Sequence, residues 1–123
     1  LPEGYRNLMA IGSIEHDFSM GYSENIGFRA GICSSFNFYD LAQDYETKLR
    51  IHPFAYMDVA LKNGLKLLPE QAIEEIKQMT DEVRCVGGEM ISIWHNESLS
   101  NKREWIGWRN VYEKMIEYSF NEK

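Results

Sequence analysis

The chain has 123 residues, of which 44% are hydrophobic and 26% are charged, and its formal net charge is −6. This length and composition exclude a disordered chain and predict a single globular domain over residues 1–123 with a buried core. Lys and Arg are scattered along the sequence, which lacks the basic face that nucleic-acid binding needs. Its apolar runs are far shorter than the roughly 20 residues of a membrane-spanning helix. The sequence therefore predicts neither a nucleic-acid partner nor a membrane partner.

The cysteines and the chain start bear on the cellular compartment. Cys33 and Cys85 form no CxxC pair, and two reduced thiols are typical of a cytoplasmic protein. The first residues lack the basic and apolar regions of a signal peptide, and the first residue is Leu1 rather than Met. We therefore expect a cytoplasmic location and a chain that begins inside a longer protein.

The first half of the chain predicts a helix, short strands and one long loop. An apolar stripe with a closing glycine indicates a helix over 1–12. A short strand is expected over 14–20. The aromatic and glycine-rich stretch 22–41 lacks periodicity, which is typical of an ordered functional loop. Further short strands are expected over 49–54, where a proline limits the strand, and over 55–61.

The second half predicts two helices around a buried strand. Apolar residues recur at steps of three and four over 69–86 and indicate an amphipathic helix. The mostly apolar run 89–95 is typical of a buried strand. A last helix is expected over about 102–120, with Ser100 or Asn101 as its N-cap. Its inner face would consist of Trp105, Trp108, Val111, Tyr112, Met115, Ile116 and Ser119.

Strands that alternate with helices predict an α/β fold with parallel strands, joined by right-handed crossovers. Three or four strands with three helices make a poor closed sheet, so sheet edges and apolar helix faces would stay open. We therefore expect self-association into a homo-oligomer, or contact with a missing N-terminal part, to cover them.

Three residues are candidates for chemistry because they lie where strands are expected to end, or in a glycine-rich loop. Ligands of α/β sheets collect beyond the carboxyl ends of the strands. Asp58 and His95 each end an apolar run, and Arg29 lies in the loop 27–31. A histidine at such a position suits proton transfer near neutral pH, and a carboxylate beside it would fix its tautomer. The alternatives are a histidine that only caps a strand and an arginine that is a solvated surface charge.

The sequence offers no obvious metal centre. His16 with Asp17, and His52, look isolated, and no HxH, HxxxH or HxxE spacing occurs. A catalytic metal normally takes three protein ligands, so we expect no metal ligands in this chain. Cys33 is expected to be a packed thiol rather than a nucleophile.

Four segments in this order resemble the polysaccharide deacetylases of the NodB-homology type. They are DFSMGY at 17–22, GFRAG at 27–31, HP at 52–53 with MD at 57–58, and SIWHN at 92–96. The resemblance implies a distorted (β/α) barrel that removes acetyl groups from N-acetylated sugars with a divalent metal, commonly zinc. The early family motifs with the metal ligands and the base are absent here. The resemblance therefore implies a partial (β/α) barrel, with parallel strands and flanking helices, that corresponds to the C-terminal part of the family.

The resemblance also implies roles for single residues. His95 would be the general acid that protonates the departing amine, with Asp58 as its partner. Arg29 would orient the catalytic base and line the groove, although Ala30 and Gly31 follow it where the family has a proline and an aromatic residue. Residues beside the acid, Ile93 and Trp94, would shape the pocket for the acetyl methyl group.

The sequence thus predicts a protein that hydrolyses N-acetyl groups of amino sugars in its full-length form, with an N-acetylated saccharide as substrate. The isolated chain is expected to be inactive and to hold no metal tightly. The alternative is a non-catalytic α/β carbohydrate-binding or assembly module, in which aromatic side chains stack on sugar faces. The candidates for such stacking are Trp94, Tyr39, Phe36 and Phe38. A third possibility is that every aromatic residue belongs to the core.

Overall fold

The computed structural model describes residues 2–120 and shows a mixed α/β fold. In chain order its helices and strands are α1 (Pro2–Ile11), β1 (His16–Asp17), β2 (Phe36–Asp40), β3 (Tyr45–Ile51), β4 (Tyr56–Met57), the π-helix η1 (Ala60–Gly64), α2 (Pro69–Cys85), β5 (Ser92–Ile93), the 3₁₀ helices η2 (Asn96–Leu99) and η3 (Arg103–Trp105), and α3 (Trp108–Phe120). Two sheets form among these residues, with the orders β1-β3-β2 and β4-β5. These five strands do not close into a barrel.

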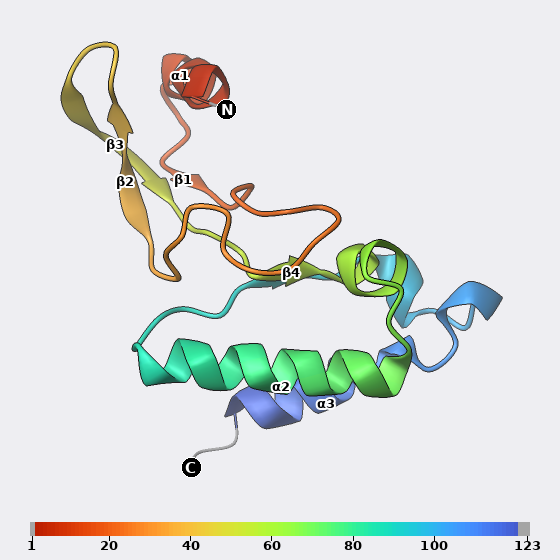
Figure 1. Cartoon of the computed structure of the whole chain (residues 1–123). Helices are drawn as coiled ribbons and strands as arrows, with labels where there is room; N and C mark the ends of the chain where they lie inside the picture. The colour runs from red at the N-terminus through yellow and green to blue at the C-terminus, as the bar shows by residue number, and fades with distance from the viewer. Residues whose placement is uncertain (1, 121–123) are drawn as a thin grey trace.

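The first sheet and α1 form what we call the hairpin half, which is the upper part of Figure 1. β2 and β3 pair as an antiparallel hairpin with an irregularity between Asn37 and Tyr39, and the short β1 pairs in parallel with β3. α1 covers this sheet through Tyr5, whose ring packs edge-on against Phe38 at 5.1 Å between ring centres. The buried residues are Tyr5, Met20, Phe38, Leu49 and Ile51.

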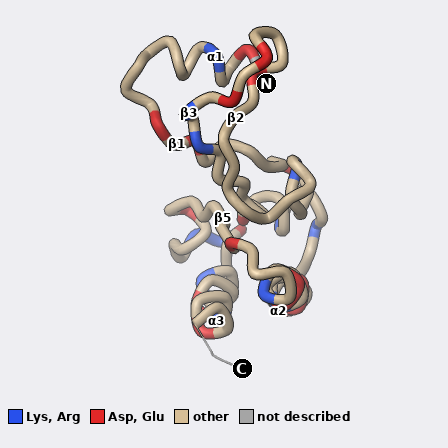
Figure 2. The backbone as a smooth tube through the Cα atoms, turned by 90° about the vertical axis from the view of Figure 1, so that its left-hand side faces the viewer, with Lys and Arg blue, Asp and Glu red and all other residues tan. Residues whose placement is uncertain are grey.

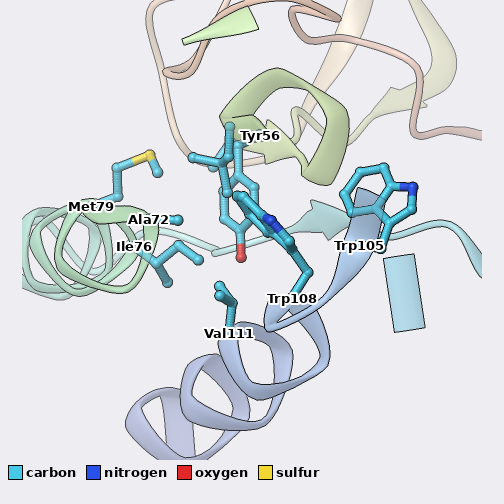
Figure 3. Packing of buried hydrophobic residues seen from close by; sticks show 9 residues of the cluster. Tyr56, Ala72, Ile76, Met79, Trp105, Trp108 and Val111 are labelled. Atoms are coloured by element: carbon cyan, nitrogen blue, oxygen red, sulfur yellow. The ribbon is translucent and has the colours of Figure 1, made fainter. Parts of the chain in front are cut away.

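The second sheet and the long helices form the helix half, residues 55–120. β4, α2 and β5 make one strand–helix–strand unit in which the strands pair in parallel, as Tyr56 with Ser92 and Met57 with Ile93. α3 packs against α2, and Tyr56 fills the space between the two helices and the sheet (Figure 3). The buried cluster comprises Ala55, Tyr56, Leu61, Ala72, Ile76, Met79, Trp105, Trp108 and Val111.

The two long helices begin and end where local chemistry favours it. Pro69 occupies the first turn of α2, and the side chain of Gln71 accepts a hydrogen bond from the Leu68 amide at 2.9 Å, so one otherwise unpaired amide is satisfied. α2 ends before Gly87, which takes a φ of +66°, and α3 begins after Gly107, with a φ of +90°. Both glycines adopt a backbone conformation that other residues rarely take.

The sequence predictions need several corrections of element boundaries. The strand expected over 55–61 is limited to β4, because the π-helix η1 begins at Ala60. The stretch expected to be one loop contains β2, because its aromatic residues alternate across a strand that β3 pairs with. The last helix begins at Trp108 rather than at residue 102, since Gly107 separates it from the 3₁₀ turn at Arg103–Trp105. β3 begins at Tyr45, earlier than expected. The expected parallel pairing holds for β1–β3 and β4–β5 but not for the hairpin.

The segment between β1 and β2 is ordered by hydrogen bonds to both halves. Phe54 donates its amide to the Met20 carbonyl at 3.0 Å, and Gly27 donates its own to the Ala55 carbonyl at 2.8 Å. Ala55 donates in turn to the carbonyl of Ile91 at 2.7 Å, so this segment, β4 and β5 lie side by side. Of the ordered loop expected over 22–41, residues 22–35 therefore exist as irregular backbone. Together with residues 18–21 they form a segment that lies beside β4.

Three further observations concern the surface charge, the possibility of a membrane span and the cysteine thiols. Lys and Arg are spread over both halves of the molecule rather than gathered on one face, and acidic residues lie among them (Figure 2). Across residues 2–120, every helix is too short or too polar to cross a membrane. Cys33 is half-buried and Cys85 exposed, and both are free thiols.

Candidate functional site

The carboxylate of Asp58 is the buried centre of the candidate site. Asp58 follows β4 directly and is completely inaccessible to solvent. A buried carboxylate is stable only if its oxygens accept hydrogen bonds. Oδ1 accepts from the Val59 amide at 2.7 Å, and Oδ2 accepts from the His95 amide at 2.6 Å. The two amides fix the carboxylate plane and leave Oδ1 facing the imidazole of His95.

His95 follows β5, the strand paired with β4, so the parallel register brings it to Asp58 from 37 positions along the chain. Its Nδ1 lies 2.7 Å from Oδ1 of Asp58. Ser98 anchors the backbone at this point, because its amide and its hydroxyl both donate to the His95 carbonyl, at 3.1 and 2.7 Å. The contact expected from the resemblance is therefore present between these two side chains.

This arrangement determines which nitrogen of His95 can react. An ionised carboxylate only accepts hydrogen bonds, so Nδ1 of His95 carries the hydrogen that points to Asp58. Nε2 is then the free nitrogen, an acceptor in the neutral ring and a donor in the charged ring. The His95 side chain is 51% exposed while that of Asp58 is fully covered. The pair can thus give a proton to, or take one from, a group that approaches from solvent.

Arg29 lines a surface groove whose lining includes neither Asp58 nor His95. Arg29, Tyr22 and Asn25 line a groove of about 600 Å³ that reaches Met57, the residue before Asp58. A second groove of about 490 Å³ is lined by Asn63 and Val59 and shares Ser23 and Glu24 with the first. Met57 lines the first groove and Val59 lines the second, and these are the residues on either side of Asp58. They present an arginine, amides, hydroxyls and one carboxylate to a ligand.

The aromatic candidates do not gather around His95. Trp94 is half-buried and packs edge-on against Tyr112 and Tyr56, at 5.2 and 6.1 Å between ring centres, so it belongs to the core of the helix half. Successive strand residues point to opposite faces, so Ile93, half-buried in β5, lies on the face opposite Trp94.

The other aromatic candidates lie on β2, in the other sheet. Phe36 packs against the core of the hairpin half, and Phe38 is buried within it. Tyr39 is exposed, and its hydroxyl donates to the Asp44 carboxylate, which raises the pKa of the phenol. The structure therefore does not place Trp94 beside the three aromatic residues of β2, and Tyr39 is the exposed ring among the four.

A pair of histidines was missed by the sequence analysis. His16 and His52 were expected to be isolated, but Nδ1 of His16 lies 2.9 Å from Nε2 of His52. The signal that could have found them is that both stand on expected strands, and two short strands of one sheet often pair. Within residues 2–120, no group of three His, Cys, Asp or Glu side chains is placed to hold a metal ion. The described residues therefore do not provide the three-ligand site of the resembled family.

Comparison of the chain with protein-family models, with curated proteins and with solved structures finds no significant match.

Proposed function

We propose that the Asp58–His95 pair is the proton-transfer half of an amide hydrolase that removes acetyl groups from N-acetylated amino sugars. The observation that carries the proposal is the buried, doubly hydrogen-bonded carboxylate that holds the ring of a half-exposed histidine. The resemblance of the segments around Asp17, Arg29, Asp58 and His95 to polysaccharide deacetylases supplies the substrate class. The same resemblance supports a partial (β/α) barrel that a longer protein completes.

Each residue of the site has a role in this proposal. When the amide bond breaks, the amine nitrogen leaves as a poor leaving group unless it gains a proton. Protonated His95 can give it the hydrogen on Nε2, while Asp58 keeps Nδ1 protonated and holds the ring in place. Arg29 would hold the polar substituents of the sugar in the groove of about 600 Å³. Activation of the attacking water would belong to residues outside this chain.

Acetate release from N-acetylglucosamine oligomers by the longer protein tests the proposal. His95→Gln should lower kcat by roughly 10²–10⁴-fold, the usual contribution of a general acid. Sugar affinity should change little. Asp58→Asn should also lower kcat, since the amide can turn its NH₂ toward Nδ1 and impose the other tautomer. Glu97→Gln is the matched control, because Glu97 is exposed and lies two positions from His95. Its carboxylate forms an exposed ion pair with Lys102.

Two outcomes would contradict the proposal. Unchanged kcat in His95→Gln, with normal folding, would remove His95 from the chemistry. Loss of sugar affinity in step with activity would make His95 a binding residue. The chain of 123 residues alone should release no acetate in the presence of Zn²⁺, and release by this chain would overturn the division of the site between two parts.

A further inference from the structure

The His16–His52 pair is the strongest chemical feature that the proposed function leaves unused. The chain has only three histidines, and two of them meet at the surface of the hairpin half. Nδ1 of His16 and Nε2 of His52 lie 2.9 Å apart, and the ring centres lie 5.1 Å apart. Two neutral imidazoles at this distance share one hydrogen, because one nitrogen must donate and the other accept.

The backbone holds both residues in place independently of their side chains. The Arg50 amide donates to the Glu15 carbonyl, and the His52 amide donates to the Asp17 carbonyl, both at 2.8 Å. These hydrogen bonds lie on either side of His16 and join β1 to the end of β3. The Phe18 ring stacks on that of His52 at 4.4 Å, with only 9° between the ring planes. The two rings are therefore brought together by a strand pairing and a stacked neighbour.

The spacing of the rings suits a chelated cation. Two nitrogens bound about 2.0–2.1 Å from a tetrahedral ion lie roughly 3.3 Å apart, with ring centres roughly 5.2 Å apart. The observed ring centres already have that spacing, so the rings need only turn until both lone pairs point to one ion. For adjacent positions of a square-planar Cu²⁺ ion, the nitrogens lie roughly 2.9 Å apart at the same bond length.

We propose that His16 and His52 form a two-histidine chelate for a late first-row divalent cation such as Cu²⁺, Ni²⁺ or Zn²⁺. Imidazole is a preferred ligand of these ions. The shared hydrogen moves to the outer nitrogen of its own ring, so both rings stay neutral and each gives one lone pair. His16 is exposed, so water completes the coordination. The net charge of −6 favours a cation over an anion. This site is separate from Asp58 and His95 and stands without the proposed hydrolase activity.

Titration of the chain with Cu²⁺, without a polyhistidine tag and after treatment with a chelator, tests the site. All proteins carry Cys85→Ser, because the exposed thiol of Cys85 is a competing ligand. We expect one Cu²⁺ per chain, with electron paramagnetic resonance splitting from two imidazole nitrogens. His16→Asn and His52→Gln should each weaken the affinity by about tenfold or more, equal to about 1.4 kcal/mol. His95→Gln is the matched control and should change the affinity by less than about twofold.

A second measurement needs no variant of the histidines. In the imidazole nitrogen NMR spectrum, addition of Zn²⁺ should shift the signals of His16 and His52 and leave those of His95 in place. Equal Cu²⁺ affinity in the His16→Asn/His52→Gln double variant would overturn the proposal. So would loss of binding in His95→Gln alone, or an absence of saturable Zn²⁺ binding. Failure of this site would leave the test of the proposed hydrolase unchanged, because that test reads acetate release.

Discussion

The helix half and the hairpin half differ in the size of their apolar cores. The core of the helix half contains nine buried residues, which are Ala55 just before β4 and residues of β4, η1, α2, η3 and α3. The hairpin half has a core of five and relies on polar contacts as well. Thr47 donates its buried hydroxyl to the Phe38 carbonyl at 2.6 Å, and Arg6 pairs with the buried Asp40 at 3.2 Å. The helix half therefore has the larger apolar core, while both halves also bury polar side chains, such as Asp58 and Thr80 in one and Asp40 and Thr47 in the other.

The position of the candidate chemistry follows from this difference. Asp58 and His95 stand at the edge of the well-packed helix half, where η1, α2 and α3 fix β4 and β5. A rigid scaffold keeps a donor and an acceptor within a narrow range of distances, which proton transfer needs. In the hairpin half, His16 lies on β1 and His52 directly follows β3, at the surface, as would suit the proposed site, whose ligand exchanges with solvent.

The largest expected effect is on the core of the helix half. Trp108 is 2% exposed and packs against Trp105, with ring centres 5.8 Å apart. Trp108→Ala should lower the free energy of unfolding by about 3–5 kcal/mol, the usual cost of removing a large buried ring. Urea unfolding followed by circular dichroism measures this loss. Ile106→Ala, at a side chain that is 70% exposed, is the control and should cost less than about 0.5 kcal/mol.

A smaller effect is expected at Gly64 in η1, which contacts the segment between β1 and β2. A Cβ at Gly64 would clash with the backbone carbonyl of Glu24. Backbone cannot move aside as a flexible side chain can, so Gly64→Ala should cost about 1–3 kcal/mol, typical of overpacking. The thermal midpoint of unfolding measures it. Gly4→Ala is the matched control, since Gly4 lies in α1 with open space around it, and it should be neutral or stabilising. Equal midpoints for both variants would contradict the tight contact.

The smallest effect concerns the buried carboxylate of Asp40, in the hairpin half. Burial alone would raise the pKa of Asp40, but hydrogen bonds from the Arg6 side chain and from the amides of Gln43 and Ala42 outweigh it and lower that pKa. A carboxyl whose pKa is lowered in the folded state stabilises the fold at pH values above its ordinary pKa, which is 3.8 here. The stabilisation is lost as the pH falls below about 4 and through the lowered pKa.

Urea unfolding at a series of pH values between about 2 and 6 tests this contribution. Asp40→Asn should flatten the fall in stability toward acid. Glu104→Gln is the control, since Glu104 is exposed, and it should leave the profile as it is. The same slope in Asp40→Asn and in the unchanged protein would show that Arg6 and Asp40 do not carry the acid sensitivity.

The sequence predicted an element best where apolar residues recur at one helical period along its whole length. The apolar spacing over 69–86 predicts α2 nearly to the residue, because one helix face is buried along its length. The hairpin was missed because the turn between β2 and β3, residues 41–44, lacks a glycine, and Asp44 takes the positive φ that glycine usually takes in such turns. The start of α3 was misplaced because Gly107 lies inside an otherwise helical pattern and its positive φ is not visible in composition.

The candidate site was predicted in part for the same reasons. Asp58 and His95 each follow an apolar run, and parallel pairing of the two runs brings them together. The stacking candidates Tyr39 and Phe36 lie in the other sheet, which the sequence did not reveal because that sheet depends on the undetected hairpin. The His16–His52 contact depends on the register of a strand only two residues long, which a single sequence does not specify.

The placement of the indole rings gives the molecule an internal optical reporter. All three tryptophans, Trp94, Trp105 and Trp108, belong to the helix half. Emission excited at the red edge of the protein absorption band therefore reports on that half alone, while the phenols of Tyr5, Tyr39 and Tyr45 absorb in the other. If the two halves melt together, indole emission and backbone ellipticity will give superimposable curves. If the hairpin half opens first, ellipticity will fall while the indole signal stays constant, and the difference between the two curves will give the stability of the hairpin half.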